Sequence, residues 1–145
     1  MLCSAAPGGW SQVAADRVRS GTGRGKVIAL DLSDIEPIPG VDILKLDVGE
    51  PETFDRILAA LDGARADVLL SDMAAPATGH RATDHLRVIG LVETALDMGE
   101  AVLAPGGTFL AKVFQGGAGS EMMARLKRSF AKVVHVKPKA SRPES

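Results

Sequence analysis

The chain has 145 residues, of which 46% are hydrophobic and 24% are charged, and its formal net charge is −1 at pH 7. This composition predicts one folded domain over residues 1–145, and it excludes a wholly disordered chain and a uniformly basic nucleic-acid-binding protein. No apolar run approaches the about 20 residues of a membrane-spanning helix. The single cysteine excludes a disulfide framework. Because the first residues lack the basic and apolar regions of a secretory signal, we expect a soluble, cytoplasmic protein without membrane contact.

Short apolar runs alternate with helix-like stretches along the chain. Runs that are rich in Leu or β-branched residues and have the length of a strand predict strands at 26–31, 41–46, 67–70, 108–114 and 132–136. Apolar spacing and breaker residues predict helices at 10–19, 52–61, 84–103 and 119–130. This alternation indicates an α/β fold with a mostly parallel sheet and helices on both faces.

Acidic residues follow three of the predicted strands, namely Asp31, Asp47 and Asp72. Ligands of parallel α/β sheets gather at the carboxyl ends of the strands. An acid in the place of Asp31 accepts both ribose hydroxyls of a nucleotide, and Asp47 could accept from an exocyclic amine such as that of adenine. The alternative for each acid is a turn residue or a helix cap.

Lys112 stands within the apolar segment Phe109–Gln115. A lysine in a buried strand is costly unless it is paired or functional, and strand polarity brings it to the same end of the sheet as Asp72. Asp72 and Lys112 are therefore the strongest candidate pair for chemistry. The alternative is an exposed lysine on an edge strand.

The segment Pro7-Gly8-Gly9-Trp10 leads into the first predicted helix. Two glycines let the backbone approach a ligand closely, and a helix N-terminus offers free N–H groups. The alternative is a plain turn, with Trp10 in the core. In the loop after Asp72, His80 and His85 are more typical of a polar loop than of metal ligands, so no metal site is expected.

Basic residues gather near the C-terminus, where Glu144 is the one acid among them. They could neutralise phosphates, although a solvated helix face followed by a tail is the alternative. The basic residues are Arg125, Lys127, Arg128, Lys132, His135, Lys137, Lys139 and Arg142.

The segments AAPGGWSQVA, LLSDMAAP, VLAPGGTFLAKVFQG and VKPKASRPES, in this order, resemble the FtsJ/RrmJ (RlmE) family of ribosomal RNA large subunit 2′-O-methyltransferases. The resemblance implies a Rossmann-like enzyme that uses S-adenosylmethionine (SAM) to methylate a uridine ribose 2′-hydroxyl of 23S ribosomal RNA within the large ribosomal subunit. It implies that Gly8 and Trp10 contact the methionine end of SAM, that Asp31 binds the ribose and that Asp47 binds the adenine.

The resemblance also implies a catalytic pair. Asp72 matches an acid beside the methyl donor, and Lys112 matches the catalytic lysine. The C-terminal basic segment would then hold RNA phosphates. We expect the protein to act as a monomer.

The resemblance implies a sheet with strand order 3-2-1-4-5-7-6, of which this chain lacks most of the first and last strands. Leu2-Cys3-Ser4 stands where the family has an acid and a glycine, and a further catalytic lysine and glutamate would lie outside residues 1–145. The alternative function is therefore a catalytically impaired SAM- or RNA-binding fragment. A second alternative, an NAD-dependent oxidoreductase, is disfavoured because the chain has no G-x-G-x-x-G motif.

Overall fold

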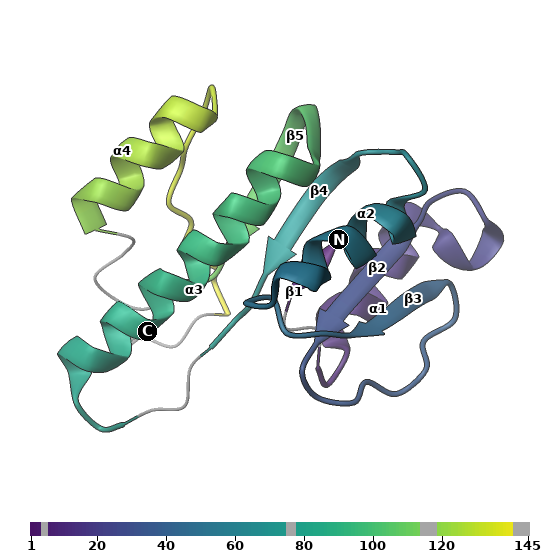
Figure 1. The fold of residues 1–145 in the computed structure, drawn as a ribbon, viewed down its shortest axis with the longest axis horizontal. Coiled ribbons are helices and arrows are strands. Elements are labelled where there is room, and N and C mark those ends of the chain that lie inside the picture. Colours follow the sequence, from purple (N-terminus) through teal and green to yellow (C-terminus); the bar gives the residue numbers. More distant parts are fainter. Residues whose placement is uncertain (4–5, 75–77, 114–118, 141–145) are drawn as a thin grey trace.

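The computed structural model describes residues 1–3, 6–74, 78–113 and 119–140, and it confirms the alternation of strands and helices (Figure 1). The four predicted helices are present, and four of the five predicted strands are present with shifted ends. Among the described residues, no helix is both long enough and apolar enough to cross a bilayer. The elements are β1 (Leu2–Cys3), α1 (Gly9–Val18), the 3₁₀ turn η1 (Ser20–Thr22), β2 (Val27–Asp31), β3 (Val41–Lys45), α2 (Pro51–Leu61), β4 (Ala66–Ser71), α3 (Arg81–Val102), β5 (Leu103–Ala111) and α4 (Gly119–Ser129).

The five strands form a parallel sheet in the order β3-β2-β1-β4-β5, which confirms the predicted fold class. As expected, β1 is very short, and it lies at the centre of the sheet. Leu2 stands opposite Ala29 on one side and Leu70 on the other. Met1 continues this pairing, because its carbonyl accepts a hydrogen bond from the Leu70 N–H at 2.9 Å.

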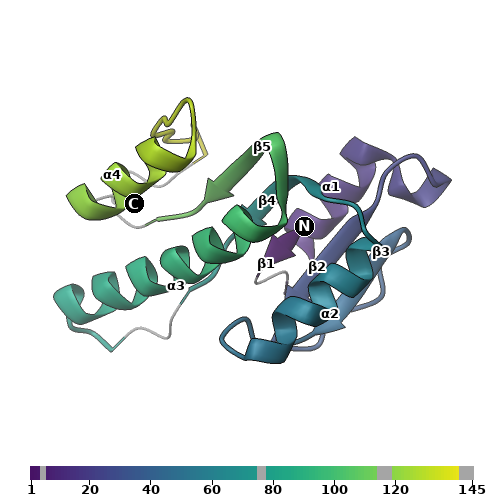
Figure 2. The ribbon, with the colours of Figure 1, turned by 45° about the horizontal axis from the view of Figure 1, so that its top comes forward.

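Helices cover both faces of the sheet (Figure 2). On one face, Ala15 of α1 packs in a cluster with Val27 and Ala29 of β2. On the other face, α2 and α3 pack against the sheet, and Ile57 of α2 is fully buried there in a cluster with Leu30. Burial of these alternating strand residues on both faces explains why the strands read as short, nearly continuous apolar runs.

The predicted strand at 132–136 is wrong. This segment follows α4 without regular secondary structure, and Val134 and Val136 are 63% and 74% exposed. A strand needs a neighbour to satisfy its N–H and C=O groups, and none of the described strands pairs with this segment. Apolar, β-branched composition alone therefore does not make a strand here.

The strand β5 begins five residues earlier than the sequence predicted. The segment Pro105-Gly106-Gly107, which indicated a break, lies inside β5 as an irregularity. The register with β4 jumps from Ala66 opposite Leu103 to Val68 opposite Thr108. Gly106 has a φ of +80°, a conformation that favours glycine, so the extra residues are accommodated as a bulge.

Candidate active site at the carboxyl edge of the sheet

The candidate residues from four strands lie at one edge of the sheet. Asp31 ends β2, and Asp47 lies two residues after β3. Asp72 directly follows β4, and Lys112 directly follows β5. Because all these strands are parallel, the four side chains start from the same carboxyl edge, as the sequence predicted.

Asp72 and Lys112 form an ion pair, with 3.0 Å between Lys112 Nζ and Asp72 Oδ1. The Lys112 N–H also donates to the Ser71 carbonyl at 2.9 Å, which fixes the ends of β4 and β5 against each other. The backbone therefore positions both members of the pair. This contact brings together two residues that are 40 positions apart in the sequence.

The expectation that Lys112 is buried is wrong. Its side chain is 56% exposed, whereas that of Asp72 is 27% exposed. The physical reason is that β5 is an edge strand of the described sheet and Lys112 lies just beyond its end. Lys112 is therefore exposed at a sheet edge, as the alternative interpretation expected, and it is also paired with a carboxylate, as the first interpretation expected.

Asp31 holds the loop between β1 and α1. Its Oδ2 accepts from the Ala6 N–H at 2.9 Å, and its Oδ1 accepts from the Ser33 N–H at 2.8 Å. Each carboxylate oxygen has two lone pairs, so both oxygens retain capacity for a ribose hydroxyl. Sequence reasoning missed the contact with Ala6, because nothing in the local pattern links residues that are 25 positions apart.

Asp47 fits the turn that leads into α2. Its Oδ1 accepts from the Gly49 N–H at 2.8 Å, and its carbonyl accepts from the Thr53 hydroxyl. Within the described part of the chain, Oδ2 accepts no hydrogen bond. Asp47 therefore acts as a turn residue, while one carboxylate oxygen remains available to a donor such as an amine.

The amino end of α1 has the features of an anion-binding turn. Gly8 has a φ of +124°, and a Cβ there would lie 3.0 Å from Ile38 Cδ1. No side chain among the described residues caps this helix, so the N–H groups of its first turn keep their capacity to donate. Trp10 is half-buried and packs in the core cluster on the α1 face of the sheet. The free N–H donors could bind a carboxylate, and the neighbouring Asp31 can accept from a ribose. Together they fit a nucleoside that carries an amino-acid group, as SAM does.

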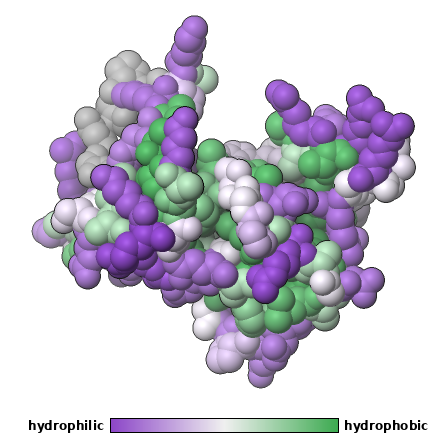
Figure 3. All heavy atoms as spheres, turned by 90° about the horizontal axis from the view of Figure 1, so that it is seen from above, coloured by the Kyte–Doolittle hydropathy of each residue, from purple (hydrophilic) through white to green (hydrophobic). Residues whose placement is uncertain are grey.

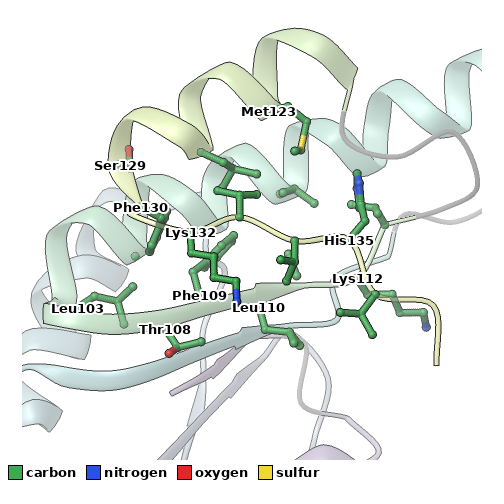
Figure 4. A pocket seen from close by; sticks show the side chains of 18 of the residues that line it. Leu103, Thr108, Phe109, Leu110, Lys112, Met123, Ser129, Phe130, Lys132 and His135 are labelled. Carbon is green, nitrogen blue, oxygen red and sulfur yellow. The ribbon is translucent and has the colours of Figure 1, made fainter.

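An open groove of about 2750 Å³ extends from Lys112 along β5 (Figure 4). Phe109 and Phe130 stack in it, with 6.0 Å between ring centroids, and segment 131–137 forms its outer wall. Among its described lining residues, Trp10 is present and Asp31 and Asp47 are absent. The groove is therefore adjacent to the Asp72–Lys112 pair rather than to the expected nucleoside-binding acids.

Of the two histidines expected in a polar loop, His80 directly precedes α3 and His85 lies within this helix. His80 caps α3, because its Nδ1 accepts from the Thr83 N–H at 3.4 Å. Thr78 donates from its hydroxyl and its N–H to Asp84 Oδ1, and these two hydrogen bonds lower the pKa of Asp84. Within the described residues, no group of three His, Cys, Asp or Glu side chains is placed to hold a metal ion.

Comparison with known proteins identifies similar chains. A family model for an FtsJ-like methyltransferase matches residues 2–145. The chain is 57% identical over 141 residues to a relative from Xanthobacter autotrophicus and 56% identical over 141 residues to one from Rhodopseudomonas palustris. Both relatives are named ribosomal RNA large subunit methyltransferase E. Each match covers 97% of this chain but 55% and 59% of the respective relative, so the chain spans little more than half of their length.

The fold also matches a solved structure. A crystal structure described as that of a ribosomal RNA methyltransferase from Plasmodium falciparum superposes with a TM-score of 0.85 at 27% sequence identity. The match covers 96% of this chain and 79% of that chain. Nearly all of the chain described above is thus found in the same arrangement in that structure.

Proposed function

The chain belongs to the FtsJ-like methyltransferase family, and from this membership we propose that it transfers a methyl group from SAM to a uridine ribose 2′-hydroxyl of 23S ribosomal RNA in the large subunit. The observation that carries the proposal is the Asp72–Lys112 ion pair at the carboxyl edge of the sheet. Because the proposed substrate is ribosomal, we also propose that the protein is located in the cytoplasm. The chain spans only part of its relatives, so its own activity needs a direct test.

We propose that five residues contribute to SAM binding, and that Asp72 is the one that lies beside the methyl donor. Asp31 accepts from the ribose hydroxyls through the lone pairs that Ala6 and Ser33 leave free. Asp47 accepts from the adenine amine, while Gly8 and Trp10 contact the methionine end at the amino end of α1. When bound, SAM supplies a methyl group that is already activated by the sulfonium charge, so the residues proposed here need only position the reactants.

Lys112 is proposed to hold the 2′-hydroxyl oxygen in line with the methyl group. A ribose hydroxyl is a weak nucleophile, and alignment is a large source of rate enhancement. An ammonium paired with Asp72 donates hydrogen bonds and has no lone pair to accept a proton. The ion pair therefore supports orientation of the hydroxyl by charged Lys112. The hydroxyl proton then passes to solvent as the O–CH₃ bond forms and the C–S bond breaks.

Replacement of Lys112 tests this role. We expect Lys112→Ala to reduce methyl transfer to undermethylated large ribosomal subunits by about 100-fold or more, with SAM affinity unchanged in isothermal titration. Lys112→Arg keeps the positive charge and the donors but cannot accept a proton. If orientation is the role, Lys112→Arg retains part of the activity that Lys112→Ala loses.

Lys26→Ala is the matched control, because Lys26 is 53% exposed and pairs with Asp42 at 3.4 Å. Full activity of Lys112→Ala would show that the proposed role is wrong. A chain that binds SAM but transfers no methyl group to the subunits would favour the alternative of a binding fragment.

A further inference from the structure

We propose that a second RNA contact surface lies at the turn between α1 and β2, away from the candidate active site. This surface, the arginine turn, consists of Arg17, Arg19 and Arg24 together with Gly21 and Gly23. It would bind phosphates of the same RNA that enters the candidate active site. The proposal rests on the proposed function, because a ribosomal RNA substrate is the source of those phosphates.

The arginine turn is strongly positive in a chain whose net charge is −1. Residues 16–26 contain four basic residues and one acid, Asp16. The three arginines are exposed, and within the described residues none of them forms an ion pair, whereas Lys26 pairs with Asp42. Three guanidinium groups are therefore available to an external anion. Arginine is well suited to phosphate because its planar fork can donate two parallel hydrogen bonds.

The backbone of the turn is held in place by its own hydrogen bonds. Arg19 and Gly23 flank η1 with φ angles of 55° and 73°. The Arg19 carbonyl accepts from the N–H groups of Thr22 and Arg24 at 3.1 and 3.4 Å. The arginine side chains therefore project from an ordered turn, so a bound phosphate would impose less ordering cost than it would on a loose loop.

Gly21 is an exposed position of the arginine turn that can be changed without a clash. A Cβ at Gly21 would meet nothing within 4 Å, and its backbone lies outside the left-handed region. Neither packing nor conformation therefore requires glycine at this position. A side chain there would meet no neighbour, so an acidic one would change the charge of the arginine turn without disturbing its packing.

Charge differs between the two faces of the sheet. Residues 50–62, which contain α2, hold four acids and one base, Arg56. Because α1 and α2 pack on opposite faces, a polyanion is attracted to the α1 face and repelled from the α2 face. Figure 3 shows hydrophilic side chains standing out at the end of the molecule that carries η1 in Figure 1.

The length of α1 separates the arginine turn from the Gly8-Gly9 turn of the proposed cofactor site. The helix α1 has 10 residues and is therefore about 15 Å long. It connects the Gly8-Gly9 turn at the carboxyl edge of the sheet with the arginine turn near the amino end of β2. Lys112 lies farther away, because β1 and β4 separate β2 from β5. A ligand that contacts both the arginine turn and Lys112 must therefore be an RNA of several nucleotides rather than a mononucleotide.

The test uses an unmodified 23S ribosomal RNA transcript, and it measures affinity as a function of KCl between about 50 and about 300 mM. We expect Arg17→Ala/Arg24→Ala to lower the slope of log K against log salt by about 1 to 2, with SAM affinity unchanged. Arg56→Ala on α2 is the control and should leave the slope unchanged. Gly21→Glu should weaken RNA binding without removing an arginine, and Gly21→Gln should not.

The proposal is overturned if the double variant keeps the slope of the parent chain, or if Arg56→Ala lowers the slope as much. Equal RNA affinities for Gly21→Glu and Gly21→Gln would overturn it as well. Loss of methyl transfer in the parent chain would count against the proposed function only, because RNA affinity is measured separately. If the parent chain binds no transcript, the proposal that the arginine turn binds RNA is wrong, whether or not the chain transfers methyl groups.

Discussion

Two residues show how local backbone geometry prepares the proposed cofactor site. Gly8 adopts a φ of +124°, and a Cβ there would make a tight contact with the terminal methyl group of Ile38, whereas Gly9 has open space around its Cβ position. The two adjacent glycines of this motif therefore differ in what the fold demands of them. Gly8 is required by its conformation and packing, while the absence of a side chain at Gly9 only affects how closely a ligand can approach.

The glycine pair gives a prediction at the residue scale. Gly8→Ala should destabilise the chain by about 1–3 kcal/mol, because an L-residue is strained at this φ. Gly9→Ala should leave the free energy of unfolding nearly unchanged. Denaturant unfolding without SAM measures both values. Equal stabilities of the two variants would contradict the assignment.

At the scale of elements, α4 is held on α3 by a small charged network. Arg125 donates to Asp97 Oδ1 at 2.6 Å and to Glu100 Oε2 at 2.7 Å, and Ser129 donates to Glu100 Oε1 at 2.5 Å. Hydrogen bonds from Arg125 and then Ser129 lower the pKa of Glu100 below its ordinary value of 4.5. The network orients α4, whose residues Met123, Leu126 and Ser129 line the groove.

The network makes stability depend on pH. Since the pKa of Glu100 is lowered in the folded state, its contribution is complete above pH 4.5 and is lost as the pH falls through the folded-state pKa. Glu100→Gln should therefore lower Tm at neutral pH, by at most about 4 °C for such exposed charges, and the difference should vanish in acid. Thermal unfolding across this pH range checks it. Glu93→Gln, at an exposed position on the same helix, should show no such pH-dependent difference.

At the scale of the whole molecule, positive charge lies at two separate places. The arginine turn is one, and the exposed residues of the C-terminal segment are the other, with Lys132 and His135 beside the groove in Figure 4. Lys139 is also exposed, whereas Arg142 and Glu144 lie outside the described residues. The net charge of −1 does not reveal these two positive regions. A polyanionic ligand responds to the local charge of such regions more than to the net charge.

The C-terminal segment should contribute its own share of RNA binding. Lys132→Ala and Lys139→Ala should each lower the salt slope by about 0.7–0.9 if each lysine neutralises one phosphate. The same RNA titration measures this effect. Lys45→Ala serves as the control, because it removes an exposed lysine of β3 that pairs with Asp34. Slopes that match the control would show that this segment does not bind RNA.

The sequence by itself determined the layers of the fold and the edge that carries the candidate site. The apolar runs that end in Asp31 and Asp72 were sufficient to predict the buried strands and the edge at which they end, because burial on both faces of a parallel sheet imposes that pattern. The motif around Gly8 and Gly9 likewise marked the turn before α1. These features depend on residues close together in the chain, so the local pattern contains them.

Only the tertiary structure decided which distant groups meet and which predicted segments find partners. The segment 132–136 has strand composition but no neighbouring strand among the described residues, and Lys112 is exposed because β5 lies at an edge of the described sheet. The hydrogen bond from Ala6 to Asp31 and the contact between Arg125 and Glu100 join residues 25 positions apart in each case. Such contacts depend on how the elements pack in three dimensions, and no local periodicity encodes that packing.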